Sequence, residues 1–379
     1  MHPARRLTLV TPSLGAGGAE RVVQGLAVGF VDAGHEVSVV TTTSRPDFYA
    51  LDPRVRRMAI DLTGASPGLG GSIRRVPSMV RQLAPMIREL GAAIDATDPH
   101  LVVTFMEDIN VLGLMACAGR HPVVVTEHND PRHHTTARVW RALRRTTYGR
   151  AACLVSVSEG VDRAFGWLPP EKRRVIHNPL PTPMPGHVDR ALDMSGPLVA
   201  GMGRLTRQKG FDLLIEAFAA VAHEHPEWSL VIVGEGPDRP ELEALVVRLG
   251  LTGRVHLPGR RRNPLADLSS AELFALPSRW EGFGNVVAEA LSVGVPVVSF
   301  DCPSGPGEII DDGRTGLLVE PGNVAELARA IDTLIRDPAR RGMMAAAAPA
   351  SVAHLQIDRV VERWEEQVLS GAVASAGSP

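Results

Sequence analysis

The stretch Pro277-Ser278-Arg279-Trp280-Glu281-Gly282-Phe283-Gly284-Asn285 leads directly into a helical pattern that carries Glu289. A glycine turn that opens a helix points unpaired N–H groups and the positive end of the helix dipole at an anion, which favours a phosphate. Glu281 and Glu289 would repel that phosphate unless they accept hydrogen bonds from hydroxyls of the same ligand. A nucleotide sugar satisfies both requirements. The alternative is an ordinary helix start with Asn285 as N-cap, which does not explain the glycines between the acids.

Short β-branched segments alternate with helical patterns on both sides of this stretch. Strands are predicted at Leu7–Thr11, Glu36–Thr42, Leu101–Phe105, Val123–Thr126, Cys153–Val157, Leu198–Met202, Leu230–Val233, Val255–Leu257, Leu273–Leu276 and Val295–Ser299. This alternation predicts parallel sheets covered by helices, an α/β architecture with two Rossmann-like, doubly wound domains. Residues 43–91 are predicted to form a loop and then a helix. Ligands of such sheets bind beyond the carboxyl ends of the strands, so a cleft between the domains is expected.

Proline spacing marks the division of the chain. Pro179, Pro181, Pro183 and Pro185 occur at every second residue, which excludes a helix or a central strand. We therefore predict a first domain at 1–178, a proline-rich linker at 179–196 and a second domain at 197–352. A helix at 353–369 is expected to pack back on the domains, and the tail 370–379 is expected to be disordered.

The composition excludes several classes of protein. The chain has 379 residues, of which 44% are hydrophobic and 22% charged, as in soluble globular proteins, and 4% are aromatic, too few for a platform that stacks nucleic-acid bases. The 3 cysteines are scattered, which argues against a disulfide framework and a zinc site and favours a reducing cytoplasm. No apolar segment is long enough for a membrane span, and no signal peptide is recognisable.

Basic residues are concentrated in the first half of the chain. Six arginines surround one predicted helix there: Arg132, Arg138, Arg141, Arg144, Arg145 and Arg150. They could contact anionic lipid headgroups or a phosphorylated acceptor, which allows peripheral association with the inner face of a membrane. The alternative is a solvated helix face, which is the more common role of charge runs.

The second domain opens with a strand followed by the glycine-rich loop Gly201–Gly210. Arg204 and Lys209 leave the sheet at its ligand-binding edge in this loop and could neutralise a diphosphate. The chain contains only one other lysine, Lys172, which indicates that a compact ammonium is needed at position 209. A surface loop with ordinary charges is the alternative.

Two segments of the first domain are candidates for the same ligand. Gly17 and Gly18 lie in a turn between a strand and a helix that can hold a phosphate, although Glu20 stands where a dinucleotide fingerprint needs a small residue, so an NAD enzyme is disfavoured. His128 follows another strand at its carboxyl end. A bland structural role is the alternative for this histidine, and no cysteine or carboxylate accompanies it at a spacing typical of metal ligands.

Further loops at strand ends could contribute to donor binding. Gly234, in Val233–Pro237, and Gly259, in Leu257–Arg260, could form the wall around a nucleotide base. Residues 301–308 form another Gly-Pro loop. Each of these is equally explained as a simple turn.

Together these residues resemble the retaining glycosyltransferases of family 4, the group 1 glycosyltransferases with the GT-B fold. The resemblance covers nearly the whole chain and depends on three motifs: Glu281 and Glu289 around Gly282-Phe283-Gly284, the pair Arg204 and Lys209, and the amino-terminal glycine loop. Residues 301–308 and Thr126-Glu127-His128-Asn129 resemble members that build bacterial surface polysaccharides and lipid-linked oligosaccharides, commonly from UDP-sugars. The resemblance implies two Rossmann-like domains facing a cleft.

The resemblance also implies a role for each matching position. Arg204 and Lys209 would hold the donor diphosphate in place of a metal ion, so no metal cofactor is expected. Glu281 would hold hydroxyls of the transferred sugar, Glu289 would accept hydrogen bonds from the ribose, and the stretch Gly282-Phe283-Gly284-Asn285 would bind phosphate or sugar oxygens through its amides. Gly17, Gly18 and His128 would approach the donor from the first domain.

The function implied is hexosyl transfer from a nucleotide sugar to a carbohydrate, lipid-linked or polyol acceptor. A UDP-sugar is the expected donor, and a GDP-sugar is the alternative. Nucleic acid is not expected as a partner. The alternatives are a sugar-nucleotide epimerase, a glycosyl phosphorylase, and a non-catalytic sensor of nucleotide sugars. The sensor is disfavoured because all five charged or titratable candidates, Arg204, Lys209, Glu281, Glu289 and His128, are present.

Overall fold

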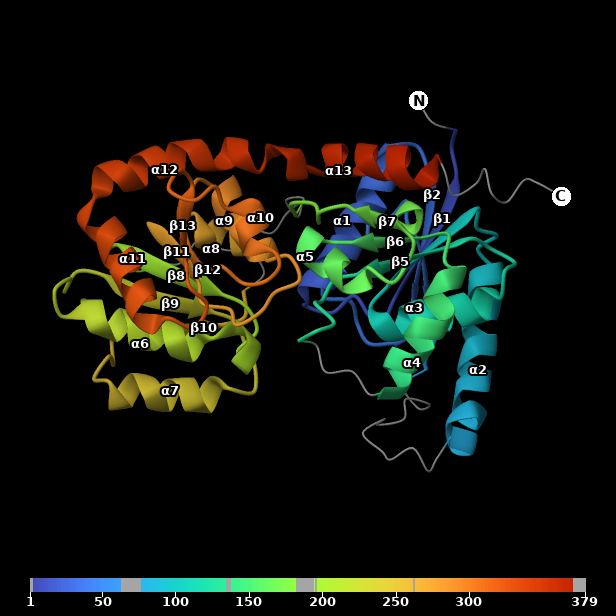
Figure 1. Ribbon diagram of the computed structural model, residues 1–379, viewed down its shortest axis with the longest axis horizontal. Coiled ribbons are helices and arrows are strands. Elements are labelled where there is room, and N and C mark those ends of the chain that lie inside the picture. Colours follow the sequence, from blue (N-terminus) through green and yellow to red (C-terminus); the bar gives the residue numbers. More distant parts are fainter. Residues whose placement is uncertain are drawn as a thin grey trace. The chain divides into compact units, whose positions relative to one another are not determined.

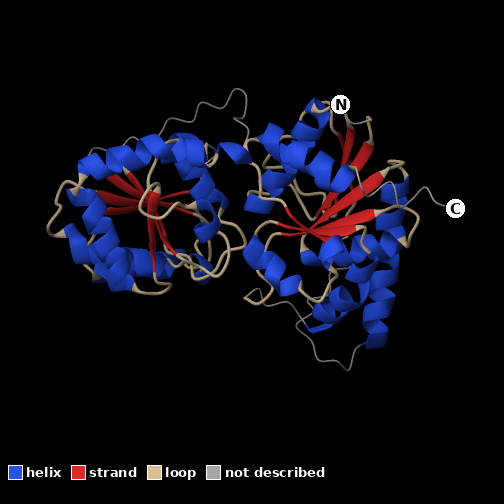
Figure 2. Ribbon diagram, turned by 45° about the horizontal axis from the view of Figure 1, so that its top comes forward, coloured by secondary structure: helices blue, strands red, loops and turns tan. Residues whose placement is uncertain are grey.

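The computed structural model describes residues 3–62, 76–133, 138–181, 194, 196–261 and 263–370. The chain divides into two compact units, one formed by Met1–Pro181 together with Gln356–Pro379, and the other by Thr182–Leu355. Each unit has a central sheet with helices on its faces (Figures 1 and 2). The end of the chain therefore belongs to the same unit as its beginning.

The sheet of the first unit is entirely parallel and has the order β3-β2-β1-β4-β5-β6-β7. Its strands are β1 Arg6–Thr11, β2 Glu36–Thr41, β3 Arg56–Ala59, β4 Leu101–Phe105, β5 Val123–Glu127, β6 Cys153–Ser156 and β7 Arg173–Val175. All residues of β4 and β5 are buried, as expected for strands covered on both faces. The strand order reverses between β1 and β4, which makes the carboxyl ends of these two strands the expected binding edge.

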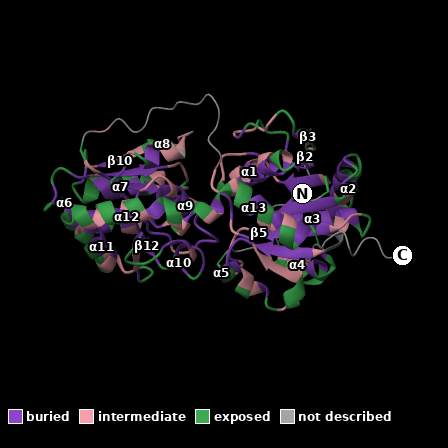
Figure 3. Cartoon of the chain, turned by 90° about the horizontal axis from the view of Figure 1, so that it is seen from above, coloured by how far each residue is buried: buried purple, intermediate pink, exposed green. Residues whose placement is uncertain are grey.

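Helices of the first unit pack on this sheet and on one another. They are α1 Gly18–Asp32, α2 Val76–Asp95, α3 Glu107–Cys117, α4 Arg138–Thr147 and α5 Glu159–Asp162. Within this set α3 contacts both α2 and α4. Figure 3 shows the strands as buried and the exposed residues on the outer faces of the helices.

The last helix completes the core of the first unit. It comprises α13, Ile357–Trp364, and a π-helical turn, Glu365–Leu369. Trp364 is buried in a cluster with residues of α1, β1 and β4, and its ring meets the Phe30 ring edge-on with centroids 5.9 Å apart. The helix also carries Glu365, whose Oε1 lies 3.3 Å from Nε2 of the buried His35. Apolar burial and this polar contact together fix the helix to the first unit.

The sheet of the second unit is also parallel, with the order β10-β9-β8-β11-β12-β13. Its strands are β8 Leu198–Met202, β9 Ser229–Val233, β10 Val255–Gly259, β11 Leu273–Leu276, β12 Val297–Phe300 and β13 Gly316–Val319. The order reverses between β8 and β11. Its helices are α6 Phe211–Ala222, α7 Arg239–Arg248, α8 Pro264–Leu268, α9 Asn285–Ser292, α10 Pro306–Ile309, α11 Val324–Arg336 and α12 Pro338–Ser351.

The predicted α/β class with two doubly wound sheets is confirmed. Three edge strands were missed, β3, β7 and β13. Arg56–Ala59 and Arg173–Val175 are partly exposed and have no apolar run, and Gly316–Val319 has only 4 residues. Parts of three predictions lie outside the described residues: the loop at 63–75, most of the linker at 182–193 and the tail at 371–379. The predicted helix at 353–369 begins as a short 3-10 turn, Ala353–Leu355, and becomes helical again at Ile357.

Candidate active site

The two loops that the sequence singled out in the second unit follow β8 and β11, the strands at which the strand order reverses. One loop runs from Gly203 to Gly210 and the other from Pro277 to Gly284. Ligands of doubly wound sheets bind at this position because the helices after the two strands lie on opposite faces and leave a crevice between the loops. The topology thus brings Lys209 and Glu281 to one sheet edge although they are 72 positions apart in sequence.

Lys209 and Glu281 form a direct ion pair at this edge. Lys209 Nζ lies 2.5 Å from Glu281 Oε1, and Ser278 Oγ donates to the same oxygen at 2.6 Å. Glu281 is buried, and no residue in the described part of the chain donates to its second oxygen, Oε2. One carboxylate oxygen is therefore anchored by protein groups, while the other remains able to accept hydrogen bonds from a ligand.

Further bonds hold the two loops together. Gln208 Nε2 donates to the Trp280 carbonyl at 3.0 Å, and the Arg279 backbone N–H donates to the Gln208 carbonyl at 2.8 Å. The Arg279 guanidinium pairs in a bidentate manner with Asp212 at 2.8 and 2.7 Å. Burial would raise the pKa of Asp212, but the hydrogen bonds and charge of Arg279 outweigh burial and hold the pKa below its usual value.

The glycine turn before α9 has the geometry that its sequence requires. Gly284 has φ 91°, a left-handed conformation that favours glycine, and it is the N-cap of α9. Asn285 is the first helical residue, so the alternative in which its side chain caps the helix is wrong. Gly282 and Phe283 are buried beside this turn. Glu289, on α9, is buried as well, with 1% of its surface exposed. Ser304 Oγ donates to the Glu281 carbonyl at 2.8 Å. Both acids of the motif thus occupy buried positions around one turn.

Arg204 and the two predicted base-loop glycines lie at neighbouring strand ends. The Arg204 side chain is exposed, and no described residue bonds its guanidinium. A Cβ added to Gly234 would lie 1.8 Å from the Gly203 carbonyl oxygen, so glycine is required there for backbone packing. Gly259 has φ 89° and accepts a hydrogen bond from the Gly234 N–H at 2.9 Å. The structural explanation therefore suffices for both glycines, whatever they bind.

In the first unit the glycine turn after β1 contains a carboxylate. Gly17 is the N-cap of α1 and Gly18 its first residue. A Cβ at Gly17 would lie 2.1 Å from Glu20 Oε2, and Ser13 Oγ donates to Glu20 Oε1 at 3.4 Å. The Glu20 side chain thus covers the turn in which a phosphate was expected.

His128 follows β5 and is a neutral, largely buried imidazole. Burial lowers its pKa to about 4. The Thr126 hydroxyl donates to the Thr104 carbonyl at 2.8 Å and lies 3.1 Å from His128 Nε2, so Nε2 must carry the hydrogen that joins these two side chains. Nδ1 is then the acceptor, and it has no partner among the described residues. His128 can accept a hydrogen bond at Nδ1 but cannot serve as a cationic acid near neutral pH.

A small pocket lies beside His128 within the first unit. His177 and Asn178, which follow β7, line it together with Trp364 from α13. The other lining residues are Val22, Leu26, Phe105, Thr126, Val155, Val157, Ile176 and Pro179. The pocket is lined mostly by apolar side chains, and it is too small for a substrate-sized ligand.

Glu127, adjacent to His128, belongs to a buried polar network. The Tyr148 hydroxyl donates to Glu127 Oε1, and Asn110 Nδ2 donates to the Tyr148 oxygen at 3.0 Å. Burial raises the pKa of Glu127 to about 7, and the Arg144 guanidinium, 4.0 Å away, opposes this rise. This network connects the end of β5 with α3 and α4.

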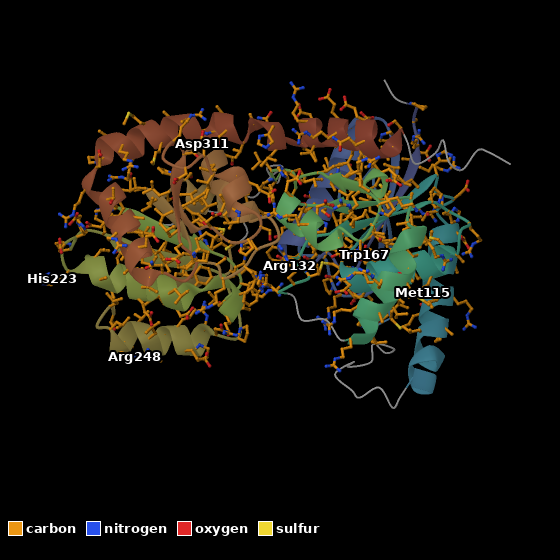
Figure 4. The ribbon with its side chains drawn as sticks, in the orientation of Figure 1. Met115, Arg132, Trp167, His223, Arg248 and Asp311 are labelled. Carbon is orange, nitrogen blue, oxygen red and sulfur yellow. The ribbon has the colours of Figure 1, made fainter. Side chains whose placement is uncertain are left out.

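The arginine cluster on and around α4 is partly used within the protein. Arg144 pairs with Glu107 at 3.2 Å, and Arg145 stacks over the Trp167 ring at 4.4 Å from its centroid. Arg132, labelled with Trp167 in Figure 4, pairs with the buried Asp130 at 2.6 Å. Arg138, Arg141 and Arg150 are exposed. The solvated face predicted as the alternative thus applies to only some members of the cluster.

The described residues contain neither a candidate metal cluster nor a candidate membrane-spanning helix. Within the described ranges no group of three or more His, Cys, Asp or Glu side chains is arranged to hold a metal ion. Likewise, no helix in the part of the chain that the structure describes is both long and apolar enough to cross a membrane.

Sequence reasoning missed the residues that position the candidates. Ser278 and Ser304 hold Glu281, and Asp212 pairs with Arg279. Ser278 and Arg279 stand inside the quoted motif, so their polarity was visible there. Asp212 carried no signal, because an acid in the first turn of a helix is common.

Both units match families of known proteins. Residues 187–351 match the family model described as "Glycosyl transferases group 1", and residues 16–182 match "Glycosyltransferase Family 4". An exopolysaccharide phosphotransferase of Streptomyces coelicolor is 36% identical over 188 residues, which is 49% of this chain. The matched region is only 20% of the length of that relative.

Two further similarities extend over most of the chain. The N-acetylgalactosamine-N,N'-diacetylbacillosaminyl-diphospho-undecaprenol 4-alpha-N-acetylgalactosaminyltransferase of Campylobacter jejuni is 27% identical over 347 residues, 88% of this chain and 91% of that protein. The crystal structure of Anabaena HepE with UDP and glucose has a TM-score of 0.76 and 22% identity, and the match covers 97% of this chain and 100% of that one. At this identity the second similarity shows the fold.

Proposed function

Because the chain belongs to the group 1 glycosyltransferases, we propose that it transfers a hexosyl unit from a UDP-sugar to a sugar, lipid-linked or small polyol acceptor, with retention of configuration. The observation that carries the proposal is the contact of Lys209 with one oxygen of the buried Glu281, at the point where the strand order reverses. A cation and an acceptor oxygen side by side suit a ligand that combines phosphate with hydroxyl groups.

In this proposal Lys209 and Arg204 bind the donor diphosphate and stabilise it as a leaving group. An ammonium has three N–H donors, so Lys209 can keep its bond to Glu281 while it donates to a phosphate oxygen. Arg204 is exposed at the same loop and has no competing partner among the described residues. The two cations would supply the charge stabilisation that a metal ion supplies in other transferases.

The two buried acids would orient the sugars. Glu281 Oε2 accepts hydrogen bonds from hydroxyls of the transferred hexose, while Lys209 and Ser278 fix Oε1. Glu289 accepts from the ribose hydroxyls. The amides of Phe283, Gly284 and Asn285, at the start of α9, donate to phosphate or sugar oxygens.

The remaining candidates would complete the donor and acceptor sites. Gly234 and Gly259 place backbone groups beside the nucleotide base, and Gly17 and Gly18 form a phosphate-facing turn once Glu20 withdraws. His128 Nδ1 accepts a hydrogen bond from a sugar hydroxyl. No metal cofactor takes part.

A UDP donor and a lipid-linked acceptor are supported by the relatives. HepE of Anabaena holds UDP and glucose, and the name of the Campylobacter jejuni relative includes a diphospho-undecaprenol substrate. The exposed Arg138, Arg141 and Arg150 would attract such a substrate in a membrane with anionic lipids, so we propose peripheral association with the cytoplasmic face. Co-sedimentation with liposomes tests this, and equal binding to neutral and anionic vesicles would contradict it.

The main experiment identifies the donor and then tests the site. Thermal shift with UDP- and GDP-sugars selects a donor, and acceptors are then assayed with that donor. Lys209→Ala and Glu289→Ala should each lower the transfer rate at least about tenfold, since each removes a contact worth about 1.4 kcal/mol or more. Glu243→Ala, an exposed acid on α7, is the matched control. Wild-type rates in both site variants would refute the assignment.

The products separate this proposal from its alternatives. NMR of the product decides between retention and inversion. Transfer of the sugar to phosphate would indicate a phosphorylase, conversion of the donor to its isomer an epimerase, and tight donor binding without any product a sensor.

A further inference from the structure

Arg239, the first residue of α7, joins the ends of two neighbouring strands. Its Nη2 donates to the Gly234 carbonyl, just after β9, at 3.3 Å. Its Nη1 donates to the Leu257 carbonyl, within β10, at 3.1 Å. One side chain therefore links the loop after β9, where Gly234 lies, to the end of strand β10, where Gly259 is the last residue.

The remaining donors of this guanidinium are also used. Nε and Nη2 donate to the two carboxylate oxygens of Glu235 at 2.9 and 2.7 Å, and Nη1 donates to Glu243 Oε1 at 2.9 Å. A guanidinium has five N–H donors in a fixed planar arrangement, and Arg239 makes five such bonds. A lysine has three donors at a single point and could not reach these acceptors together.

The ends of β9 and β10 that Arg239 links are packed tightly on the loop after β8. The Leu205 N–H donates to the Glu235 carbonyl at 3.0 Å, and the Gly234 N–H donates to the Gly259 carbonyl at 2.9 Å. A Cβ at Gly236 would lie 2.1 Å from the Leu205 carbonyl oxygen. The three loops follow β8, β9 and β10, which are adjacent in the sheet, so they form one continuous edge.

The loop after β8 carries Lys209 near its far end, and that end has additional support of its own. Asp212 and Arg279 hold it through their bidentate pair, and Gln208 bonds the Trp280 carbonyl. Loss of Arg239 would therefore loosen the β9 and β10 loops while Lys209 keeps its position. The β9 and β10 strand ends and the segment around Lys209 are thus held by different sets of side-chain bonds.

We propose that Arg239 is a positioning residue for the base half of the donor: it fixes the β9 and β10 loops in the conformation that holds the nucleotide base. The inference rests on the proposed function, in which these loops enclose the base. It assigns Arg239 no contact with the reacting atoms. Its effect should fall on affinity for a nucleoside diphosphate and should leave affinity for the diphosphate alone unchanged.

The experiment measures binding to the full-length protein by calorimetry, with UDP, GDP and inorganic pyrophosphate as probes. The Kd for the nucleoside diphosphate that the wild type prefers should rise about tenfold in Arg239→Lys and Arg239→Met, while the Kd for pyrophosphate changes less than twofold. Glu243→Gln, which leaves the bonds to Gly234 and Leu257 in place, should bind both probes as the wild type does.

The outcomes distinguish the inference from the proposed function. Unchanged nucleotide affinity in both Arg239 variants would overturn the inference, as would equal losses for nucleotide and pyrophosphate. If the wild type binds pyrophosphate but neither UDP nor GDP, the proposed function fails and the inference with it. Circular dichroism confirms folding, and Arg239→Lys alone decides the outcome if Arg239→Met does not fold.

Discussion

The docking of α13 on the first unit predicts opposite effects for two identical substitutions in α1. A Cβ added to Gly29 would lie 2.7 Å from Ile357 Cγ1 and 2.7 Å from Val361 Cγ2. At Gly25, one turn earlier, the nearest atom is Pro179 Cγ at 3.9 Å, an ordinary contact distance. Gly29→Ala should therefore push α13 away, whereas Gly25→Ala should fit.

The magnitudes follow from two opposing terms. Alanine in place of glycine in a helix interior raises the free energy of unfolding by about 1 kcal/mol. Overpacking a buried contact costs about 1–3 kcal/mol, and the upper half applies here because Ile357 and Val361 are β-branched and rotate little about χ1. We expect Gly29→Ala to lower the free energy of unfolding by about 1–2 kcal/mol, which is a roughly 5- to 30-fold change in the ratio of folded to unfolded protein. Gly25→Ala should gain up to about 1 kcal/mol.

Hydrogen–deuterium exchange measures the local effect. Peptides that cover residues 357–369 should exchange faster in Gly29→Ala than in the wild type, and at an unchanged or slower rate in Gly25→Ala. Urea unfolding gives the corresponding change in free energy. If Gly29→Ala is as stable as Gly25→Ala and leaves exchange in α13 unchanged, the close contact described here does not exist.

Substitutions at three other residues test the first unit. Glu127→Gln should weaken the pH dependence of the free energy of unfolding. The pKa of Glu127 is about 7 in the folded protein and 4.5 ordinarily, so the wild type loses stability as pH rises between these values. Urea unfolding at several pH values measures this, and the same dependence of the unfolding free energy on pH in wild type and variant would contradict it. Trp364→Ala should cost about 3–5 kcal/mol in urea unfolding, and a cost below about 1 kcal/mol would show that this ring is not part of the core. In the wild type the His128 hydrogen is on Nε2, because Thr126 accepts it. Thr126→Val should allow the hydrogen to move to Nδ1, whereas Thr126→Ser should keep it on Nε2. Long-range 1H–15N NMR measures the position of the hydrogen, and a wild type protonated at Nδ1 would refute the assignment.

The fold was predictable because its signals are local. Runs of buried β-branched residues such as Val123-Val124-Val125 lie between helices, and this pattern determines a parallel sheet. The edge strands β3 and β7 were not predictable, since neither has an apolar face to mark it. The sequence also did not predict that α13 packs on the first unit, because this packing depends on the shape of the α1 surface at Gly29.

The site was predictable only in part. The Lys209–Glu281 contact follows from motif and topology together, because both loops succeed strands at the reversal point. The bonds of Ser278 to Glu281 and of Arg239 to two strand ends depend on side-chain conformations that no spacing encodes. The covering of Gly17 by Glu20 is likewise a matter of one rotamer.

The return of α13 to the first unit reverses the expected order of folding on the ribosome. Domains usually fold in the order of synthesis. Here Thr182–Leu355 is continuous and can acquire its full core as soon as it emerges. The first unit completes its core only with Trp364 and its neighbours, which are translated after the second unit. Until then α1 presents an uncovered apolar surface to chaperones, and a fragment cut after Pro181 would keep that surface permanently.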